Sequence, residues 1–459
     1  MTTTSQEAPS GALGIRTVLL VVVVSVAAMM AVIDGTIVTA SLRDIGADLG
    51  APLSQVVWLT VGYLISAGVT MPLSGCVIDR LGPRRTLFWS LALFVSASIL
   101  CSVAWSLPVL ILFRVLQGFA GGLLEPTAVN VAASSAPAAR MGAVMSVLSS
   151  TINIGPVVGP LLGSLIAGSG HWPWIFLINV PLGAIAIVGA AVVVRPMDGA
   201  QPRGSRPDLI GMVLLPLGFV SVLLSIDRVG VSVGGWLPIL LGVFGVAVLA
   251  AYGRYSLRGG HHAVLDLTLL RHRGFRAALL TMAAVGFAMY GQLVGLPLIA
   301  AEDHGLTGIA AGLPVAALGV GCLVSMTTAG RMSDRLGTRP IVVTAAVLTA
   351  GVAVAIAVSA SWLPLSGLLS LMVVFGLTFG GVAAPTFSSI YRTVPPDRAP
   401  YATPSLFITV QLAAAGGATV AGLLVDHLAP DWAATWLYGS FTVLLLAAAG
   451  VARWLPGRQ

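Results

Sequence analysis

The sequence lacks lysine altogether, and charged residues make up only 8% of its 459 positions. Soluble domains carry about 25% charged residues, so this scarcity excludes an ordinary soluble protein. Without lysine, the chain cannot contain the G-x-x-x-x-G-K-[ST] loop that cradles nucleotide phosphates. The sequence therefore argues against a process driven by ATP at such a site.

Cysteine and histidine are also sparse. Cys76, Cys101 and Cys322 lie in or beside apolar segments without metal-ligand or disulfide spacing, so we expect them to pack as small apolar side chains. His261 and His262 have no further ligand spacing around them, so no metal site is expected. The 23 basic residues are spread over short loops with no basic domain, which argues against a nucleic-acid partner.

Apolar residues dominate what remains: 57% of the chain is hydrophobic, and its mean hydropathy is +0.99. Runs such as Thr17–Ala40 exceed the roughly 20 residues that a helix needs to cross a bilayer. This first run is too long for a signal peptide and has no convincing cleavage site, so we keep it as a span. The composition predicts an all-α polytopic membrane protein.

Apolar runs bounded by proline, glycine and charge predict transmembrane helices along the whole chain. The 14 predicted spans lie near 17–41, 54–78, 84–104, 108–131, 141–167, 172–194, 208–227, 234–252, 275–299, 308–329, 340–359, 364–389, 402–426 and 434–454. An even number of spans puts both chain ends on the same side. Of the 23 arginines, only Arg43 and Arg228 fall in loops on the other side, and Arg114 lies within a span. By the positive-inside rule, both termini are predicted to be cytoplasmic.

A charged tetrapeptide, Asp-Arg-Leu-Gly, occurs twice, at Asp79–Gly82 and Asp334–Gly337. Two six-helix repeats would place such copies roughly 190–200 residues apart, and the observed 255 leaves room for two more helices. We therefore predict a six-helix bundle over residues 1–194, two inserted helices over 195–253, a cytoplasmic linker over 254–274 and a second bundle over 275–459. In repeat transporters the substrate path lies between the halves, which favours a carrier.

Several motifs together resemble those of the major facilitator superfamily, specifically its fourteen-span drug:proton antiporters. The loop motif G-x-x-x-D-R-x-G-x-R-R is filled by Gly75, Asp79, Arg80, Gly82, Arg84 and Arg85. "RVLQGFAGG" at Arg114–Gly122, "GPVVGPLLGS" at Gly155–Ser164 and "IDGTIVTASL" at Ile33–Leu42 match three further family patterns. The resemblance covers essentially the whole chain and implies the major facilitator fold.

The sequence departs from the family pattern at three places. Thr39 stands where the family usually has Asn, Arg43 where it has Pro, and Pro173 where it has Arg. The second loop motif is partial, because Pro340 occupies its last position. Antiport remains the expectation, but these changes bear on the substrate.

Only three ionisable residues lie deep in the predicted spans: Asp34, Arg114 and Glu125. Such groups are costly at bilayer depth and are functional candidates by default. Asp34 and Arg114 fall at similar depth, so we predict an ion pair that breaks when Asp34 is protonated; the alternative is a permanent structural pair. Glu125 lies 11 residues, or about 16 Å, further along the same helix face as Arg114 and Gly118, which we expect to line the cavity. It is a second proton site or a cation-binding group, unless it is a neutral Glu hydrogen-bonded within the bundle.

Two further motifs are predicted to control conformation. The span-5 positions Gly155, Pro156, Gly159, Pro160 and Gly163 allow close helix approach and bending, and this motif is associated with antiporters; plain tight packing is the alternative. The loop residues are expected to form a gate, in which Asp79 pairs with an arginine or caps a helix. The gating residues are Gly75, Asp79, Arg80, Gly82, Arg84, Arg85, Asp334 and Arg335.

Polar and aromatic residues in other spans are candidates to line the substrate cavity. They are Gln55, Trp58, Tyr63, Asn153, Tyr290, Gln292 and Gln411. Trp58 fits the interfacial aromatic belt equally well.

The sequence as a whole predicts a monomeric carrier of a bacterial inner membrane that needs no cofactor. It would export an amphipathic drug or natural product in exchange for protons. A lipid or lysolipid translocator on the same fold, a non-transporting receptor or scaffold, and a proton-symport importer are the alternatives. The span-5 motif argues against the importer.

Overall fold

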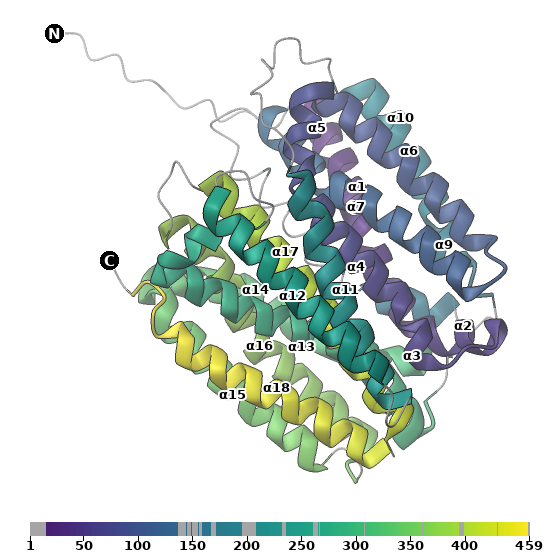
Figure 1. Ribbon diagram of the computed structural model, residues 1–459, viewed down its shortest axis with the longest axis vertical. Helices are drawn as coiled ribbons and strands as arrows, with labels where there is room; N and C mark the ends of the chain where they lie inside the picture. The colour runs from purple at the N-terminus through teal and green to yellow at the C-terminus, as the bar shows by residue number, and fades with distance from the viewer. Residues whose placement is uncertain are drawn as a thin grey trace.

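The computed structural model describes residues 15–135, 144, 148, 155, 158–166, 171–194, 208–231, 236–259, 265, 267–306, 308–359, 362–393, 399–428 and 430–457, and these contain helices and no strands. In Figure 1 the helices of the first half lie on one side, in purple and blue, and those of the second half on the other, in green and yellow. The prediction of an all-α architecture is confirmed.

Several helices of the first half are interrupted where the sequence predicts one continuous span. Its elements are α1 (Ile15–Ile37), η1 (Val38–Ser41), α2 (Leu42–Leu49), α3 (Leu53–Val56), α4 (Trp58–Thr70), α5 (Leu73–Leu81), α6 (Pro83–Ser102), α7 (Leu107–Ser135), α9 (Trp174–Leu177) and α10 (Asn179–Val193). The predicted second span is three helices, interrupted at Val57 and again before Leu73. Pro72 explains the second break, because proline lacks the N–H of a continuing helix.

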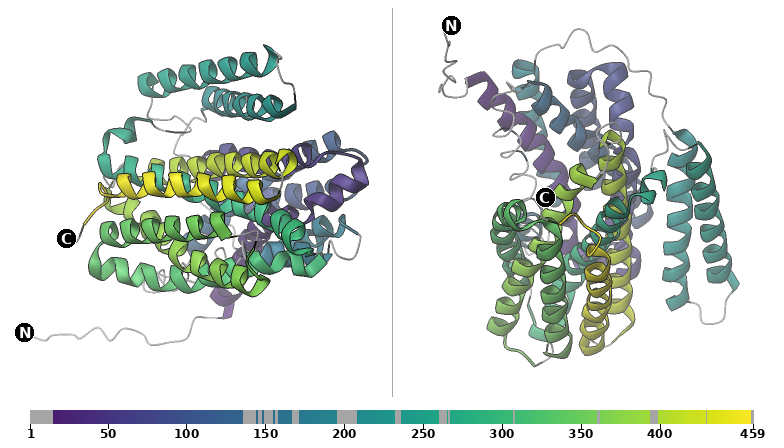
Figure 2. Two further views of the ribbon diagram at one scale, coloured as in Figure 1. Left: turned by 90° about the horizontal axis from the view of Figure 1, so that it is seen from below. Right: turned by 90° about the vertical axis from the view of Figure 1, so that its left-hand side faces the viewer.

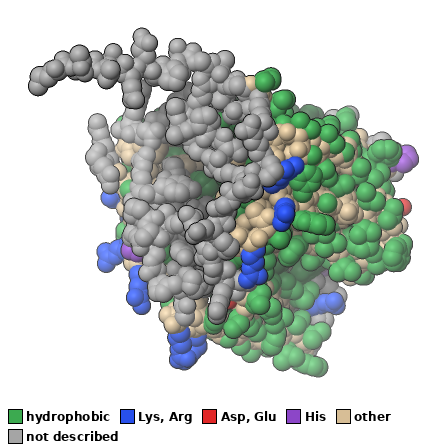
Figure 3. Space-filling model, turned by 90° about the horizontal axis from the view of Figure 1, so that it is seen from above, with side chains coloured by type: hydrophobic (Ala, Val, Ile, Leu, Met, Phe, Trp, Pro, Cys, Tyr) green, Lys and Arg blue, Asp and Glu red, His purple; other side chains and the backbone are tan. Residues whose placement is uncertain are grey.

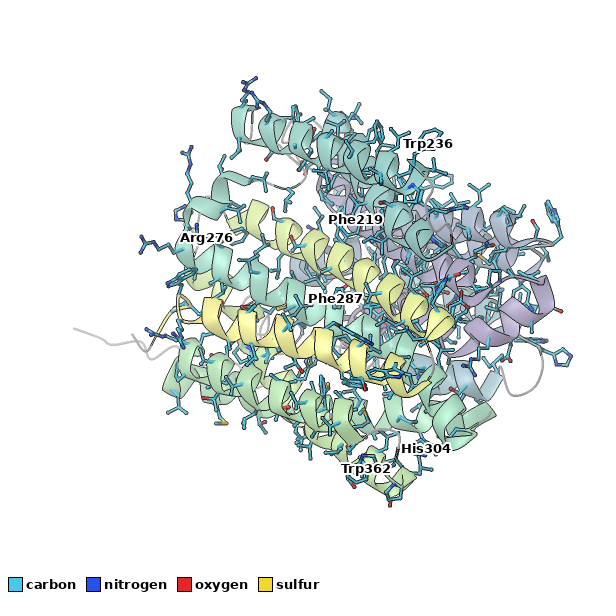
Figure 4. The ribbon with its side chains drawn as sticks, turned by 60° about the horizontal axis from the view of Figure 1, so that its bottom comes forward. Phe219, Trp236, Arg276, Phe287, His304 and Trp362 are labelled. Atoms are coloured by element: carbon cyan, nitrogen blue, oxygen red, sulfur yellow. The ribbon has the colours of Figure 1, made fainter. Side chains whose placement is uncertain are left out.

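The second half is built from longer helices. They are α13 (Arg273–His304), α14 (Leu313–Leu336), α15 (Thr338–Ser359), α16 (Leu365–Thr393), α17 (Ala399–His427) and α18 (Pro430–Ala452), with short turns η4 (Leu267–Arg271) and η5 (Gly308–Gly312). α13 runs the length of this bundle: Figure 4 places Arg276 at one end, His304 at the other and Phe287 between them. Its packing partners include α16, α17 and α18.

Two helices stand beside both halves. α11 (Leu209–Val231) and α12 (Trp236–Gly259) pack against each other as a hairpin, which Figure 2 shows apart from the rest of the molecule. α11 contacts α4 and α17, one helix from each half. The outer helix α12 is widely exposed, with Trp236 73% and Ile239 71% accessible. The hairpin corresponds to the two helices that the sequence predicts as an insertion.

Twelve described helices or continuous helical stretches are long and apolar enough to span a membrane, including Arg273–Ala301 and Thr338–Ser359. A shorter apolar stretch, Ala310–Met326, covers the end of η5 and the start of α14. In the predicted fifth span, the described residues 144, 148, 155 and 158–166 are helical. Figure 3 shows arginine side chains along the margin of one end, beside a largely hydrophobic flank. The chain is a polytopic membrane protein. We call the end that carries the α5–α6 and α14–α15 connections the loop end.

Candidate functional site

A buried ion pair lies in the first half, between α1 and α7. Arg114 Nη1 lies 2.5 Å from Asp34 Oδ2, and neither side chain is exposed. Arg114 Nη2 also donates to the backbone carbonyl of Asp34 at 3.4 Å. The structure thus brings together the two residues that the sequence places at similar depth.

Neutral polar side chains complete the coordination of Asp34. Gln117 Nε2 donates to Asp34 Oδ1 at 2.8 Å, and Asn179 Nδ2, at the start of α10, donates to the same oxygen at 2.6 Å. Both amides also donate to Ser98 Oγ on α6, at 2.7 and 3.3 Å respectively. Four helices therefore contribute to one hydrogen-bonded network around the carboxylate, and both of its oxygens accept hydrogen bonds.

The Arg114 guanidinium also makes several further contacts. Its Nε donates to the Leu59 carbonyl at 3.2 Å, and its Nη1 donates to Gln117 Oε1 at 2.7 Å. The guanidinium carbon lies 4.3 Å from the ring centre of Tyr63 and 5.6 Å from that of Phe176, so two aromatic faces add cation–π attraction. Burial of two charges is tolerated only with such complete pairing, because each unpaired charge would carry a large desolvation penalty.

The arrangement makes the pair sensitive to the charge of Asp34. A protonated carboxyl donates one hydrogen bond and no longer balances the guanidinium. Arg114 would then keep only neutral acceptors inside an apolar bundle, which is unfavourable. Since both side chains are sealed here, proton exchange requires the surrounding helices to part.

Glu125 lies further along α7 toward the loop end and is partly exposed. It is close enough to Tyr63 and Tyr290 to interact with both electrostatically. The expectation that Gly118 lines a cavity with Arg114 and Glu125 is wrong for this conformation. A Cβ at Gly118 would collide with the Tyr63 backbone, because the glycine lets α7 and α4 approach closely.

Tyr290 connects the two halves at this site. It comes from α13, yet a Cβ at Gly35 would lie 3.5 Å from its hydroxyl and 3.1 Å from Tyr63 Cε1. Both tyrosine rings therefore meet at the residue that follows Asp34. Tyr290, which is partly exposed, thus brings the second half next to the buried pair.

The other cavity candidates lie in different environments. Gln292 is fully buried on α13, and neither its Oε1 nor its Nε2 hydrogen-bonds to any described residue. Gln411 on α17 abuts Gly68 of α4, where a Cβ would lie 2.9 Å from the Gln411 Cβ. Trp58 is partly buried and Gln55 is exposed on α3, and Asn153 lies outside the described residues.

The span-5 glycines pack against α1, the helix that carries Asp34. A Cβ at Gly155 would lie 2.6 Å from Val32 Cγ1, one at Gly159 would lie 3.0 Å from the Ile33 carbonyl, and one at Gly163 would meet the Ile37 carbonyl. Pro160 is buried, and Pro156 lies outside the described residues. The stripe of small residues therefore brings a helix within a turn of Asp34 on either side.

The two loop motifs share one backbone conformation. Gly82 has φ 80° and ψ 154°, and Gly337 has φ 87° and ψ 157°, a region that is essentially restricted to glycine. This explains why the glycine is repeated with the charged residues. Arg84 Nη2 donates to the Ala191 carbonyl at 3.2 Å, which ties the first loop to α10.

The remaining loop residues lie at the surface or partly buried. Asp79 is partly buried in α5, whereas Gly75, Arg80 and Arg85 are exposed. A Cβ at Gly75 would meet nothing within 4 Å, so this conformation does not require glycine there. The side chains of Asp334 and Arg335 are outside the described residues, although both positions belong to α14.

The end opposite the loops is closed by contacts between the halves. Arg43 Nη2 donates to the Leu298 carbonyl on α13 at 3.3 Å. A Cβ at Gly312 in η5 would lie 2.5 Å from Ser164 Oγ, and one at Gly422 on α17 would lie 2.6 Å from Val57 Cγ2. Arg43, one of the departures from the family pattern, thus bridges the two halves.

Sequence reasoning included Gln117 only as part of the Arg114–Gly122 motif, without a role, and did not single out Ser98 or Asn179. Gln117 follows Arg114 by three residues, and this helical spacing places both on one face and could have identified it. Ser98 and Asn179 come from other spans, where nothing in the sequence fixes the rotation of each helix toward Asp34. They emerge only from the packing of the bundle.

Comparison with known proteins gives the same picture. The family model described as Major Facilitator Superfamily matches residues 24–261 and 278–459. "Multidrug resistance protein B homolog" of Mycobacterium tuberculosis is 30% identical over 408 residues, 87% of this chain and 75% of the relative. "Multidrug export protein EmrB" of Escherichia coli is 30% identical over 333 residues, 72% of this chain and 64% of the relative.

A solved structure shares the fold at low sequence identity. The crystal structure of a D-xylose–proton symporter superimposes with a TM-score of 0.69, covering 96% of this chain and 98% of the other, at 16% identity. Such a likeness supports the arrangement of helices and says nothing of the substrate.

Proposed function

The chain belongs to the major facilitator superfamily, and from this premise we propose that it is a proton-coupled antiporter. It would export amphipathic small molecules, drugs or a natural product, across the bacterial cytoplasmic membrane. The printed names of its relatives refer to multidrug resistance and export, which supports this class of substrate.

The observation that carries the proposal is the sealed Asp34–Arg114 pair beside a tyrosine from the other half. A carboxylate that is balanced by one arginine changes the stability of its surroundings when it gains a proton. Tyr63 stacks on Arg114 and meets Tyr290 at Gly35, so a change at the pair reaches the interface between the bundles. This links protonation to the movement of one half against the other.

Conformational control would come from the two motif regions. The span-5 glycines pack on α1 on both sides of Asp34, so rocking of that helix would loosen or reseal the pair. We assign the loop residues, from Gly75 to Arg85 and at Asp334 and Arg335, to closure of the loop end in the alternate state. The closed opposite end and the free space at Gly75 fit a state that opens toward the loops.

We further propose that the loop end and both termini face the cytoplasm and that the monomer is the working unit. The bundles would comprise residues 1–194 and 275–459. The predicted insertion over 195–253 and linker over 254–274 join them, but α12 continues to Gly259, so the hairpin extends six residues into the predicted linker. Glu125, which is partly exposed and near two tyrosines, would bind the positive charge of a cationic substrate or carry a second proton. Gln292 and Gln411 would offer amide groups to substrates in an open state.

The test is substrate-driven proton movement in inside-out vesicles with an imposed pH gradient. Addition of a transported cationic or neutral compound should dissipate the gradient in wild type, and Asp34→Asn should abolish this response while the protein stays in the membrane. No response to any compound would contradict antiport. A substrate response that Asp34→Asn leaves unchanged would remove Asp34 from the coupling mechanism.

A further inference from the structure

A groove of about 390 Å³ lies on the second half between α14, α15 and α16. Small buried residues form its floor, and they are Ser325, Ala329, Ala345 and Gly381. Its volume is within the range of about 300–1,000 Å³ that is usual for small-molecule sites.

The rim of the groove is apolar and exposed, which suits a surface that the bilayer covers. Large apolar side chains frame the opening, and they are Met332 (49% exposed), Leu336 (51%), Leu348 (54%) and Leu377 (39%). It begins at Pro340, in the first turn of α15, and reaches Leu348, about 12 Å further at 1.5 Å per residue. Half of a hydrocarbon core is about 15 Å thick, so the groove spans most of one leaflet.

An exposed arginine adjoins the groove along the chain. Arg339 immediately precedes the lining residue Pro340 and is exposed, and its backbone N–H donates to the Pro456 carbonyl at 3.1 Å, which fixes its position. Arginine at the membrane surface attracts anionic lipid headgroups. A lipid phosphate at Arg339 and an acyl chain below it would follow the direction of the groove.

The first half lacks the same small floor residue. The two loop motifs are 255 residues apart, so α5–α6 corresponds to α14–α15. Glycine contacts give the correspondence of the next helices. Gly118 of α7 packs on the Tyr63 carbonyl as Gly376 of α16 packs on the Leu318 carbonyl, so α7 and α16 are related by 258 residues. By this correspondence Gly381 stands where the first half has Leu123, which is 8% exposed. Replacing a buried leucine with glycine leaves room for a foreign chain.

We propose that the groove is a binding site for an anionic phospholipid of the leaflet at the loop end. One acyl chain would occupy the space above Gly381, and the headgroup phosphate would contact Arg339. The site is separate from the Asp34–Arg114 pair and does not depend on the transported compound.

The test is photolabelling of the full chain in phosphatidylethanolamine vesicles that contain phosphatidylglycerol with a diazirine on one acyl chain. Adducts are mapped by peptide mass spectrometry and compared with those on the exposed α12 residues Val243 and Val246, which report ordinary lipid contact. We expect adducts at Met332 and Leu348 to exceed those on α12. A phosphatidylcholine probe with the same chain should label the groove less.

Variants separate the two parts of the site. Gly381→Leu, which restores the leucine of the first half, should remove groove adducts while labelling of α12 persists. Thr378→Leu narrows the same groove with less strain and should act in the same direction if Gly381→Leu fails to fold. Arg339→Gln should lower phosphatidylglycerol labelling about fivefold, the loss expected for one surface arginine, and leave phosphatidylcholine labelling unchanged. Arg258→Gln, which removes an exposed arginine from the last turn of α12, is the control and should leave groove labelling unchanged.

Two results would overturn the proposal. One is groove labelling no greater than that of α12 and indifferent to both leucine variants. The other is labelling that ignores the headgroup but is displaced by an amphipathic cation such as ethidium, which would make the groove a substrate site.

Discussion

The centres of the two bundles differ in chemistry although their helices pack alike. In the first half, Asp34, Arg114, Gln117, Ser98 and Asn179 form a hydrogen-bonded polar cluster. In the second half, the positions related to Arg114 and Gln117 are Met372 and Phe375. Phe375 stacks edge-on against Tyr438, and Tyr438 against Phe441, at ring-centre distances of 6.3 and 5.4 Å.

The glycine contacts show how similar the frameworks are. Gly118 and Gly122 of α7 press on the backbone of Tyr63 and Ala67, and Gly376 and Gly380 of α16 approach that of Leu318 and Cys322. The same close helix approach therefore supports a charged centre on one side and an aromatic centre on the other. The difference places the buried ionisable pair in the first half alone among the described residues, and the proposed proton chemistry therefore belongs to that half.

The largest loss of stability and transport is expected when Arg114 is replaced by methionine, the residue at the related position of the second half. Arg114→Met leaves the Asp34 carboxylate buried without its counter-charge, which should cost about 3–5 kcal/mol of unfolding free energy and abolish transport. Denaturant unfolding in detergent measures the loss. Adding Asp34→Asn to Arg114→Met should recover part of the stability but none of the transport. If the double variant is no more stable than Arg114→Met alone, the pair is not the source of the loss.

Glycine substitutions should affect the two halves equally. Gly118→Ala and Gly376→Ala each push a methyl group into a neighbouring backbone, and each should cost about 1–3 kcal/mol. Gly351→Ala on α15, where a Cβ meets nothing within 4 Å, is the control and should be neutral or slightly stabilising. Unequal losses from the first two variants would break the correspondence between the halves.

Removal of the Glu125 charge should affect substrates and leave stability nearly intact. Glu125→Gln should reduce transport of a cationic compound about tenfold, equivalent to about 1.4 kcal/mol, and leave that of a neutral compound within about twofold. Initial uptake rates into inside-out vesicles measure both. Equal loss for both compounds would favour Glu125 as an obligatory proton carrier.

The smallest effects come from two tyrosine hydroxyls. Tyr63 donates to the Ala31 carbonyl at 2.8 Å, so Tyr63→Phe should cost about 1 kcal/mol. Among the described residues, the Tyr438 hydroxyl makes a weak contact with Met372 Sδ at 3.8 Å, and Tyr438→Phe should cost less than about 0.5 kcal/mol. Thermal unfolding of the two variants in one detergent gives the comparison. A larger loss at Tyr438 would mean that the aromatic centre depends on polar contacts.

Much of the fold could be predicted from the sequence. The length of each apolar run indicates a span, and the arginines in the loops indicate its orientation, without knowledge of the other spans. Residue counts from the span ends also bring Asp34 and Arg114 to one depth. Rotation about each helix axis is not fixed by such counts, which is why Ser98 and Asn179 were missed and the role of Gly118 was wrong. Tyr290 was among the cavity candidates, but its position beside Gly35 depends on how the halves dock.

The most direct test of the central claim is proton release on substrate binding by purified protein in weakly buffered detergent solution. A pH indicator should report release when a transported compound is added to wild type, because the compound would displace the proton from Asp34 in the open state and the carboxylate would pair with Arg114 again. Asp34→Asn should bind the compound without this release. Equal release from wild type and Asp34→Asn would contradict the account and assign the exchanged proton to another group.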